Sequence, residues 1–135
     1  MMEAELIKKH EGYRDSIYYD TVGVPTGGYG HAFLPGSSLP KDIWDEIFLY
    51  DYNIAVSDYY SLELDLDPVR RAVIVNMIFN LGISKFLGFR KTLAYVRAGE
   101  YEKAAKEMLN SKWAGQVGRR ATELAKMMRT GEYNG

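Results

Sequence analysis

The sequence lacks cysteine entirely and holds only two histidines, His10 and His31, among its 135 residues. Without cysteine the chain can form no disulfide framework, and it has no thiolate to serve as a nucleophile or a metal ligand. Two histidines this far apart in the sequence do not make a metal site by themselves. The composition therefore gives no reason to expect a metal or another cofactor.

Long apolar runs are missing as well. No segment reaches the roughly 18 consecutive apolar residues that a membrane-spanning helix needs. The N-terminal stretch MMEAELIKKHEG carries charges throughout and lacks the apolar centre of a secretory signal peptide. We expect no membrane span, and we expect the protein to stay in the compartment where it is made unless another protein releases it.

Charge is unevenly distributed although the net charge is only −1. Residues 1–67 hold 4 Lys/Arg and 13 Asp/Glu, whereas residues 68–135 hold 13 Lys/Arg and 5 Asp/Glu. Two interpretations remain open: the halves attract each other in the folded chain, or the basic half faces an anionic polymer such as cell wall or nucleic acid. The basic half carries no RNA- or DNA-binding motif, which argues against nucleic acid as the partner.

Length and composition, with 47% hydrophobic and 26% charged residues, are typical of one globular domain that could have two lobes. Hydrophobic spacing and helix-end signals predict six helices, at 2–11, 41–60, 68–81, 91–98, 101–109 and 119–130. Asp67 and Pro68 are an N-cap and a first-turn proline, and the helix they open is apolar nearly all round. Such a helix belongs in the middle of a bundle.

The glycine-rich segment 13–30 favours a small antiparallel hairpin with Asp20 at or near its turn, and residues 33–40 read as a loop. The predicted fold class is therefore α+β. A small N-terminal sheet would join a mainly helical C-terminal body built around a buried central helix.

Two carboxylates flank this hairpin, Glu11 and Asp20. Cleavage of a glycosidic bond needs one carboxylic acid to protonate the leaving oxygen and one carboxylate to steer water or attack the sugar. Glu11 ends the first predicted helix, where the helix dipole and partial burial disfavour negative charge, as suits a general acid. Asp20 lies in a more solvated turn and should stay ionised. Thr26, on the returning strand, could share the attacking water with Asp20.

Each of these residues is weak evidence alone, because a late-helix glutamate is usually a surface residue and a turn aspartate usually serves the turn. Together they are specific. The segment EGYRDSIYYDTVGVPTGGYGH (11–31) resembles the active-site signature of the phage-type lysozymes, the muramidases of the T-even phage class. DPVRRAVIVNMIFNLG (67–82) resembles that family's central helix. KTLAYVRAGEYEKAAKEMLNSKW, RRA and MRTGEY resemble its C-terminal helices in order and spacing, so the resemblance covers nearly the whole chain.

The resemblance implies a lysozyme-like domain over 1–135, with a small lobe at about 12–60 and a helical lobe at about 61–135 plus the first helix. It implies an endolysin that hydrolyses the β-1,4 bond between N-acetylmuramic acid and N-acetylglucosamine in bacterial peptidoglycan. Glu11 would donate the proton, while Asp20 and Thr26 would hold the water that attacks with inversion. No cofactor or metal is implied.

Other residues acquire roles only through the resemblance. Arg120 would pair with Glu11, with Arg119 as its close rival. His31 and Asp51 would form a supporting ion pair, and His10 matches no functional position. The glycines of the signature include Gly28 and Gly30. Residues that would contact the glycan are Ala32, Phe79, Asn80, Thr92 and Glu107, although composition alone favours a core position for Phe79.

The chain also departs from the T-even pattern. It is shorter between His31 and the long helix, so the small lobe is trimmed. Glu107 replaces an amide and would meet an anionic peptidoglycan stem differently. Ala32 replaces a larger apolar residue, and Phe33 next door could fill that space. Near-neutral net charge should make activity fade at lower salt than in basic relatives.

Two other interpretations of the sequence remain open. A lytic transglycosylase of the same fold would keep the acid but form an anhydro sugar, and the presence of both Asp20 and Thr26 argues against it. A non-catalytic wall-binding module would keep the scaffold alone. The resemblance implies a setting of phage or prophage lysis. There a monomeric enzyme made in the host cytoplasm would need a separate membrane-permeabilising partner, a holin, to reach the wall.

Overall fold

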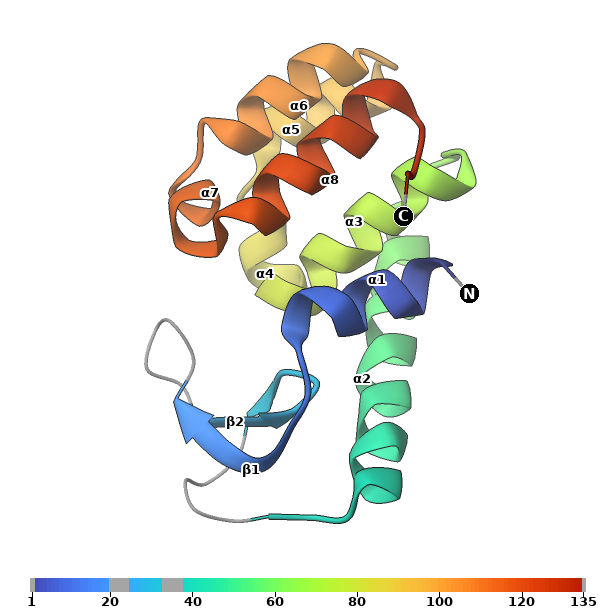
Figure 1. The fold of residues 1–135 in the computed structure, drawn as a ribbon. Coiled ribbons are helices and arrows are strands. Elements are labelled where there is room, and N and C mark those ends of the chain that lie inside the picture. The colour runs from blue at the N-terminus through green and yellow to red at the C-terminus, as the bar shows by residue number, and fades with distance from the viewer. Residues whose placement is uncertain (1, 20–24, 33–37, 135) are drawn as a thin grey trace.

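The computed structural model describes residues 2–19, 25–32 and 38–134. In this part of the chain, one helix precedes three short strands and seven further helices follow them. Figure 1 shows the small sheet on one side of the molecule and the C-terminal helices on the other, with the N-terminal helix between them. The α+β class predicted from the sequence is confirmed.

The three strands, β1 (Arg14–Tyr19), β2 (Pro25–Gly28) and β3 (His31–Ala32), form an antiparallel sheet in the order β1-β2-β3. Thr26 lies in the middle strand, opposite Tyr18 on β1 and Ala32 on β3. The predicted turn residue Asp20 lies outside the described residues, one position after β1. Phe33, and with it most of the predicted 33–40 loop, lies outside them too.

Helix α1 (Met2–Glu11) begins and ends where the sequence predicts. Gly12 adopts φ +70°, and its N–H donates to the Lys8 carbonyl at 2.9 Å, which closes the last turn. Leu6 and Ile7 are completely buried, so one side of this short helix faces the core. Glu11 is consequently held at the end of a helix that packing fixes in place.

Helix α3 (Pro68–Leu81) is the central helix. The Asp67 carboxylate accepts a hydrogen bond from the Arg70 N–H at 3.1 Å, which confirms the predicted N-cap. Its residues 72–78 are all buried. The helix contacts α1, α2 (Lys41–Ser61), α4 (Ile83–Phe86) and α8 (Arg119–Thr130), as its apolar surface requires.

The remaining helices are α5 (Arg90–Arg97), α6 (Tyr101–Leu109) and α7 (Lys112–Val117). The sequence predicted α2, α5, α6 and α8 to within one residue but missed α4 and α7. Both are too short to show a helical period, and α7 contains Gly115, a residue that disfavours helix in a sequence. Their buried aromatic residues Phe86 and Trp113 tie them to the core.

Helix α2 connects the sheet to the helical body (Figure 1). Trp44 at its start is 1% exposed, and its Nε1 donates to the Asp15 carbonyl at 3.2 Å. This bond and the packing of α2 against β2 and β3 fix the sheet to the helix. Among the described residues, no helix has the length and hydropathy for crossing a bilayer.

Candidate active site

Glu11 reaches across the molecule from α1 to α8. Its Oε1 accepts a hydrogen bond from Nη1 of Arg120 at 2.8 Å, and the two side chains are 14% and 7% exposed. Arg119, the other candidate for this pairing, is exposed. Because a charge-assisted contact between two largely buried groups is strongly directional, Arg120 fixes one oxygen of the carboxyl group.

Arg120 is itself held by the central helix. Its Nε donates to Oδ1 of Asn76 at 2.9 Å, and Asn76 is completely buried in α3. Among the described residues, the second amino group, Nη2, is buried without a hydrogen-bond partner. Two fixed contacts on one planar guanidinium leave little freedom to rotate, so α3 determines how Arg120 meets Glu11.

The other oxygen of Glu11 faces the turn that follows β2. A Cβ atom added at Gly30 would lie 2.5 Å from Oε2 of Glu11, and Gly30 has φ +84°. Both the close approach and the left-handed backbone require glycine at this position. The carboxyl group is thus held between a guanidinium on Oε1 and a glycine backbone beside Oε2.

Of the other two predicted catalytic residues, the structure describes one. Thr26 is 4% exposed in the middle strand of the sheet, in the same β2–β3 hairpin as Gly30. Asp20 lies outside the described residues. The pairing of Tyr19 with Pro25 brings the end of β1 beside the residue that precedes Thr26.

Gly28 and His31 hold the sheet against α2. A Cβ atom at Gly28 would lie 2.5 Å from the Trp44 ring, so this glycine serves packing. Nδ1 of His31 lies 2.5 Å from Oδ2 of Asp51 on α2. The expected histidine–aspartate pair is therefore present, and it ties β3 to the helix.

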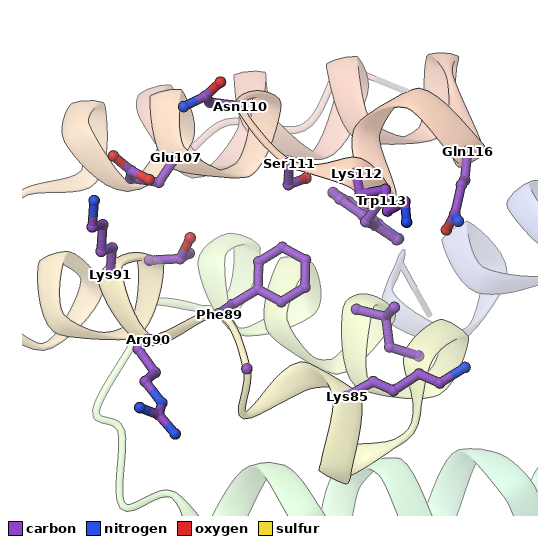
Figure 2. A pocket seen from close by; sticks show the side chains of 13 residues that line it. Lys85, Phe89, Arg90, Lys91, Glu107, Asn110, Ser111, Lys112, Trp113 and Gln116 are labelled. Atoms are coloured by element: carbon purple, nitrogen blue, oxygen red, sulfur yellow. The ribbon is translucent and has the colours of Figure 1, made fainter.

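A pocket of about 590 Å³ lies between α4, α5, α6 and α7. Two of the expected glycan contacts, Thr92 and Glu107, line it. Figure 2 shows Lys91 on α5 and Glu107 on α6 extending toward each other across one end, with Phe89 and Trp113 further along. The lining carries four cationic side chains, from Lys85, Arg90, Lys91 and Lys112.

The other expected glycan contacts lie elsewhere. Asn80 accepts a hydrogen bond from Nε1 of Trp113 at 2.8 Å, so it joins the end of α3 to the pocket wall. Phe79 packs against Phe48 at 5.5 Å between ring centroids and, with Gly30 and Asp51, lines a smaller hollow of about 180 Å³. Ala32 lies in β3 opposite Thr26.

Sequence reasoning passed over Asn76 and His10, which both belong to the surroundings of Glu11. An amide inside an otherwise apolar helix was a usable signal, because a buried polar side chain needs partners. His10 gave no such signal, since an isolated histidine in a short helix is ordinary. Within the described residues, no group of three or more His, Asp or Glu side chains could hold a metal ion.

The chain is similar in sequence to known lysozymes over nearly its whole length. Residues 8–129 match the family model described as phage lysozyme. "Probable T4-type lysozyme 1" and "Probable T4-type lysozyme 2" of Dictyostelium discoideum are 27% and 23% identical to the chain. The first alignment covers 96% of this chain and 95% of the relative, and the second covers 94% and 93%. "Pre-baseplate central spike protein Gp5" of Enterobacteria phage T4 is 29% identical over 97% of this chain but only 28% of its own length.

Proposed function

Because the chain belongs to the phage lysozyme family, we propose that it hydrolyses the β-1,4 bond between N-acetylmuramic acid and N-acetylglucosamine in bacterial peptidoglycan. Family membership implies peptidoglycan as the substrate. The observation that supports Glu11 as the general acid is the position of its carboxyl group, held by Arg120 on one oxygen and against Gly30 on the other.

In this proposal Glu11 donates its proton to the glycosidic oxygen from Oε2. A proton on Oε2 leaves Oε1 free to keep accepting from Nη1 of Arg120. The acid can therefore lose and regain its proton without losing its orientation. Fixed orientation matters because proton transfer requires the acid within hydrogen-bond reach of the leaving oxygen.

Asp20 and Thr26 hold the attacking water in this proposal, and the reaction inverts the anomeric centre. Tyr19 and Pro25, the neighbours of the two residues in the chain, are paired between β1 and β2. Proton NMR of the first product tests inversion, because a β-linked substrate then yields the α-anomer. In that experiment an initial β-anomer would contradict the inverting route. Separately, Asp20→Asn should abolish most turnover.

The pocket between α4, α5, α6 and α7 supports a second part of the proposal, in which Thr92 and Glu107 contact the substrate. In this proposal Ala32, Phe79 and Asn80 contact the substrate outside that pocket. Glu107 places a negative charge near Lys91 (Figure 2). Removing that charge should strengthen binding of an anionic stem peptide. Glu107→Gln is expected to lower KM with kcat nearly constant, and a raised KM would show that the carboxylate itself binds substrate.

Mass spectrometry of peptidoglycan digested with the purified protein tests the central proposal. Fragments that end in N-acetylmuramic acid and have gained one water establish a hydrolytic muramidase, whereas anhydro ends establish a lytic transglycosylase. Glu11→Gln, checked for native circular dichroism, is the matched control and should yield no fragments. An intact polymer from well-folded wild-type protein would contradict both reactions and leave a wall-binding module.

A further inference from the structure

His10 lies immediately before Glu11 and is almost completely buried, with a side chain 6% exposed. Its Nε2 is 3.0 Å from Oε2 of Glu123 on α8, and its Nδ1 is 3.2 Å from Nδ2 of Asn76 on α3. Asn76 is the residue that holds Arg120. One chain of contacts therefore runs from Glu123 through His10, Asn76 and Arg120 to the carboxyl group of Glu11.

Donor and acceptor roles along this chain follow from Arg120, which can only donate. Its Nε must face the oxygen of Asn76, so the amide NH₂ of Asn76 faces Nδ1 of His10. Nδ1 must then present a lone pair, and the ring proton lies on Nε2, where it is donated to Glu123. The network as built fits a single form of the imidazole, the neutral Nε2–H tautomer.

We propose that His10 is a positioning residue for Glu11, acting through Asn76 and Arg120. At acidic pH, protonation of Nδ1 of His10 breaks the chain of hydrogen bonds that links His10 to Arg120. The catalytic consequence rests on the proposed role of Glu11 as the general acid. The linkage between His10 and Arg120 does not depend on that role.

Protonation places two donors against each other. An Nδ1–H would face the NH₂ of Asn76, and rotating that amide would turn its NH₂ toward Nε of Arg120 instead. Either arrangement breaks one hydrogen bond in a buried network, where an unsatisfied polar group destabilises the folded structure. Arg120 then loses the contact that sets its angle to Glu11.

The charged groups around His10 act in opposite directions. On α8, the Glu123 carboxylate attracts a protonated ring, while Arg120 repels it. On α1, Lys9 binds the other oxygen of Glu123 at 3.2 Å and weakens that attraction, whereas Glu11 is already paired with Arg120. On α3, the neutral Asn76 opposes Nδ1 protonation by its orientation alone. His10 thus lies between the carboxylate of Glu123 at its Nε2 and the amide NH₂ of Asn76 at its Nδ1.

Two substitutions test the two ring nitrogens of His10 separately. In His10→Asn, the amide oxygen occupies the place of Nδ1, so it can accept from Asn76 but does not titrate. In His10→Gln, the amide reaches the place of Nε2 and keeps a donor for Glu123, but Asn76 loses its acceptor. His10→Gln should lower kcat about tenfold, the effect of about 1.4 kcal/mol, with KM changed less than about twofold. His10→Asn should recover most of that loss.

The pH profile distinguishes positioning from simple packing. The wild-type profile of kcat should show a step on its acid side, and His10→Asn should remove that step, whereas a packing role would leave it in place. Lys9→Gln is the control, because Lys9 contacts Glu123 but not Asn76. Its profile should keep the acid-side step, although the loss of the lysine charge beside Glu123 should change the pH at which the step falls. A loss in His10→Gln that merely follows the unfolded fraction, measured in the same buffer, would overturn the proposal.

Nitrogen-15 NMR tests the linkage without any substrate. The His10 ring should show the Nε2–H tautomer at neutral pH, and the Arg120 Nε–H resonance should move with the same midpoint as the ring. An Nδ1–H tautomer, or an Arg120 signal that ignores the titration of His10, would overturn the inference. A coupled titration in a protein that leaves peptidoglycan intact would support the linkage while contradicting the proposed function.

Discussion

The carboxyl group of Glu11 is held differently on its two sides. On the helical side, Arg120, Asn76 and His10 hold it through a chain of directional hydrogen bonds that joins three helices. On the strand side, Gly30 holds it by close contact with a backbone that carries no side chain. The helical side positions the carboxyl group through the directions of its hydrogen bonds. The strand side positions it sterically, by limiting the space beside Oε2.

We expect the two sides to tolerate substitutions differently. Hydrogen bonds between buried groups fail when either partner changes, because the remaining group is left unsatisfied. A steric contact fails only when volume is added. The helical side should therefore be sensitive to side-chain deletion and the strand side to side-chain addition, and four substitutions test that contrast.

Arg120→Ala should have the largest effect, because it breaks the helical side at its centre. It leaves Glu11 and Asn76 without their shared partner and opens a cavity, which should cost about 3 kcal/mol of unfolding free energy. Urea unfolding measures this loss. Arg120→Lys should restore only part of it, because a single ammonium cannot reproduce the planar fork. A lysine variant with wild-type stability would contradict the two-contact role.

Gly30→Ala breaks the strand side by adding one methyl group. The new Cβ would displace Oε2 of Glu11, and a displacement of about 1 Å can lower kcat about 100-fold. The left-handed backbone adds about 1–2 kcal/mol of strain. Gly28→Ala is the matched control, since its Cβ meets Trp44 instead, and it should lose stability more than activity. Steady-state kinetics together with thermal unfolding distinguish the two, and equal activity losses would contradict the contrast.

Asp51→Ala tests how firmly α2 supports the strand side. It removes the partner of His31 on β3, and because both side chains are partly exposed, the loss should be about 1 kcal/mol. Asp51→Asn keeps an acceptor oxygen and should lose less. Chemical denaturation of the two variants measures the difference. Equal losses would show that charge, not the hydrogen bond, holds β3 to α2.

Glu123→Gln should have the smallest effect on stability, because Glu123 is the residue of the hydrogen-bond chain farthest from Glu11. Burial raises the pKa of Glu123, but hydrogen bonds from His10 and Lys9 outweigh burial and hold that pKa below its usual value of 4.5. Because the folded pKa is depressed, this stabilisation is present above about pH 4.5 and is lost as pH falls through the folded pKa.

The wild type should therefore be more stable than Glu123→Gln near pH 7 by under about 1 kcal/mol, as expected for a partly exposed pair. That difference should shrink at acid pH, and urea unfolding across a pH series follows it. A difference that grows with acidity would contradict the depressed pKa.

The sequence alone determined most of the helical framework. The Asp67–Pro68 pair marks the start of the central helix, and Gly12 marks the end of α1. Such signals are local, because a cap or a left-handed glycine acts on the turn beside it. The short helices α4 and α7 were not predicted, because four or six residues are too few to show the helical spacing of apolar side chains.

The surroundings of Glu11 were decided by tertiary structure. The resemblance named Arg120 as the partner of Glu11 and left Arg119 as a close rival. Successive helix residues point about 100° apart, so only packing selects the one that faces Glu11. That contact joins residues 109 positions apart. His10 likewise gains its partners only where α1 meets α3 and α8. Local signals determine where helices begin and end, whereas hydrogen bonds between distant buried side chains exist only after the helices have packed.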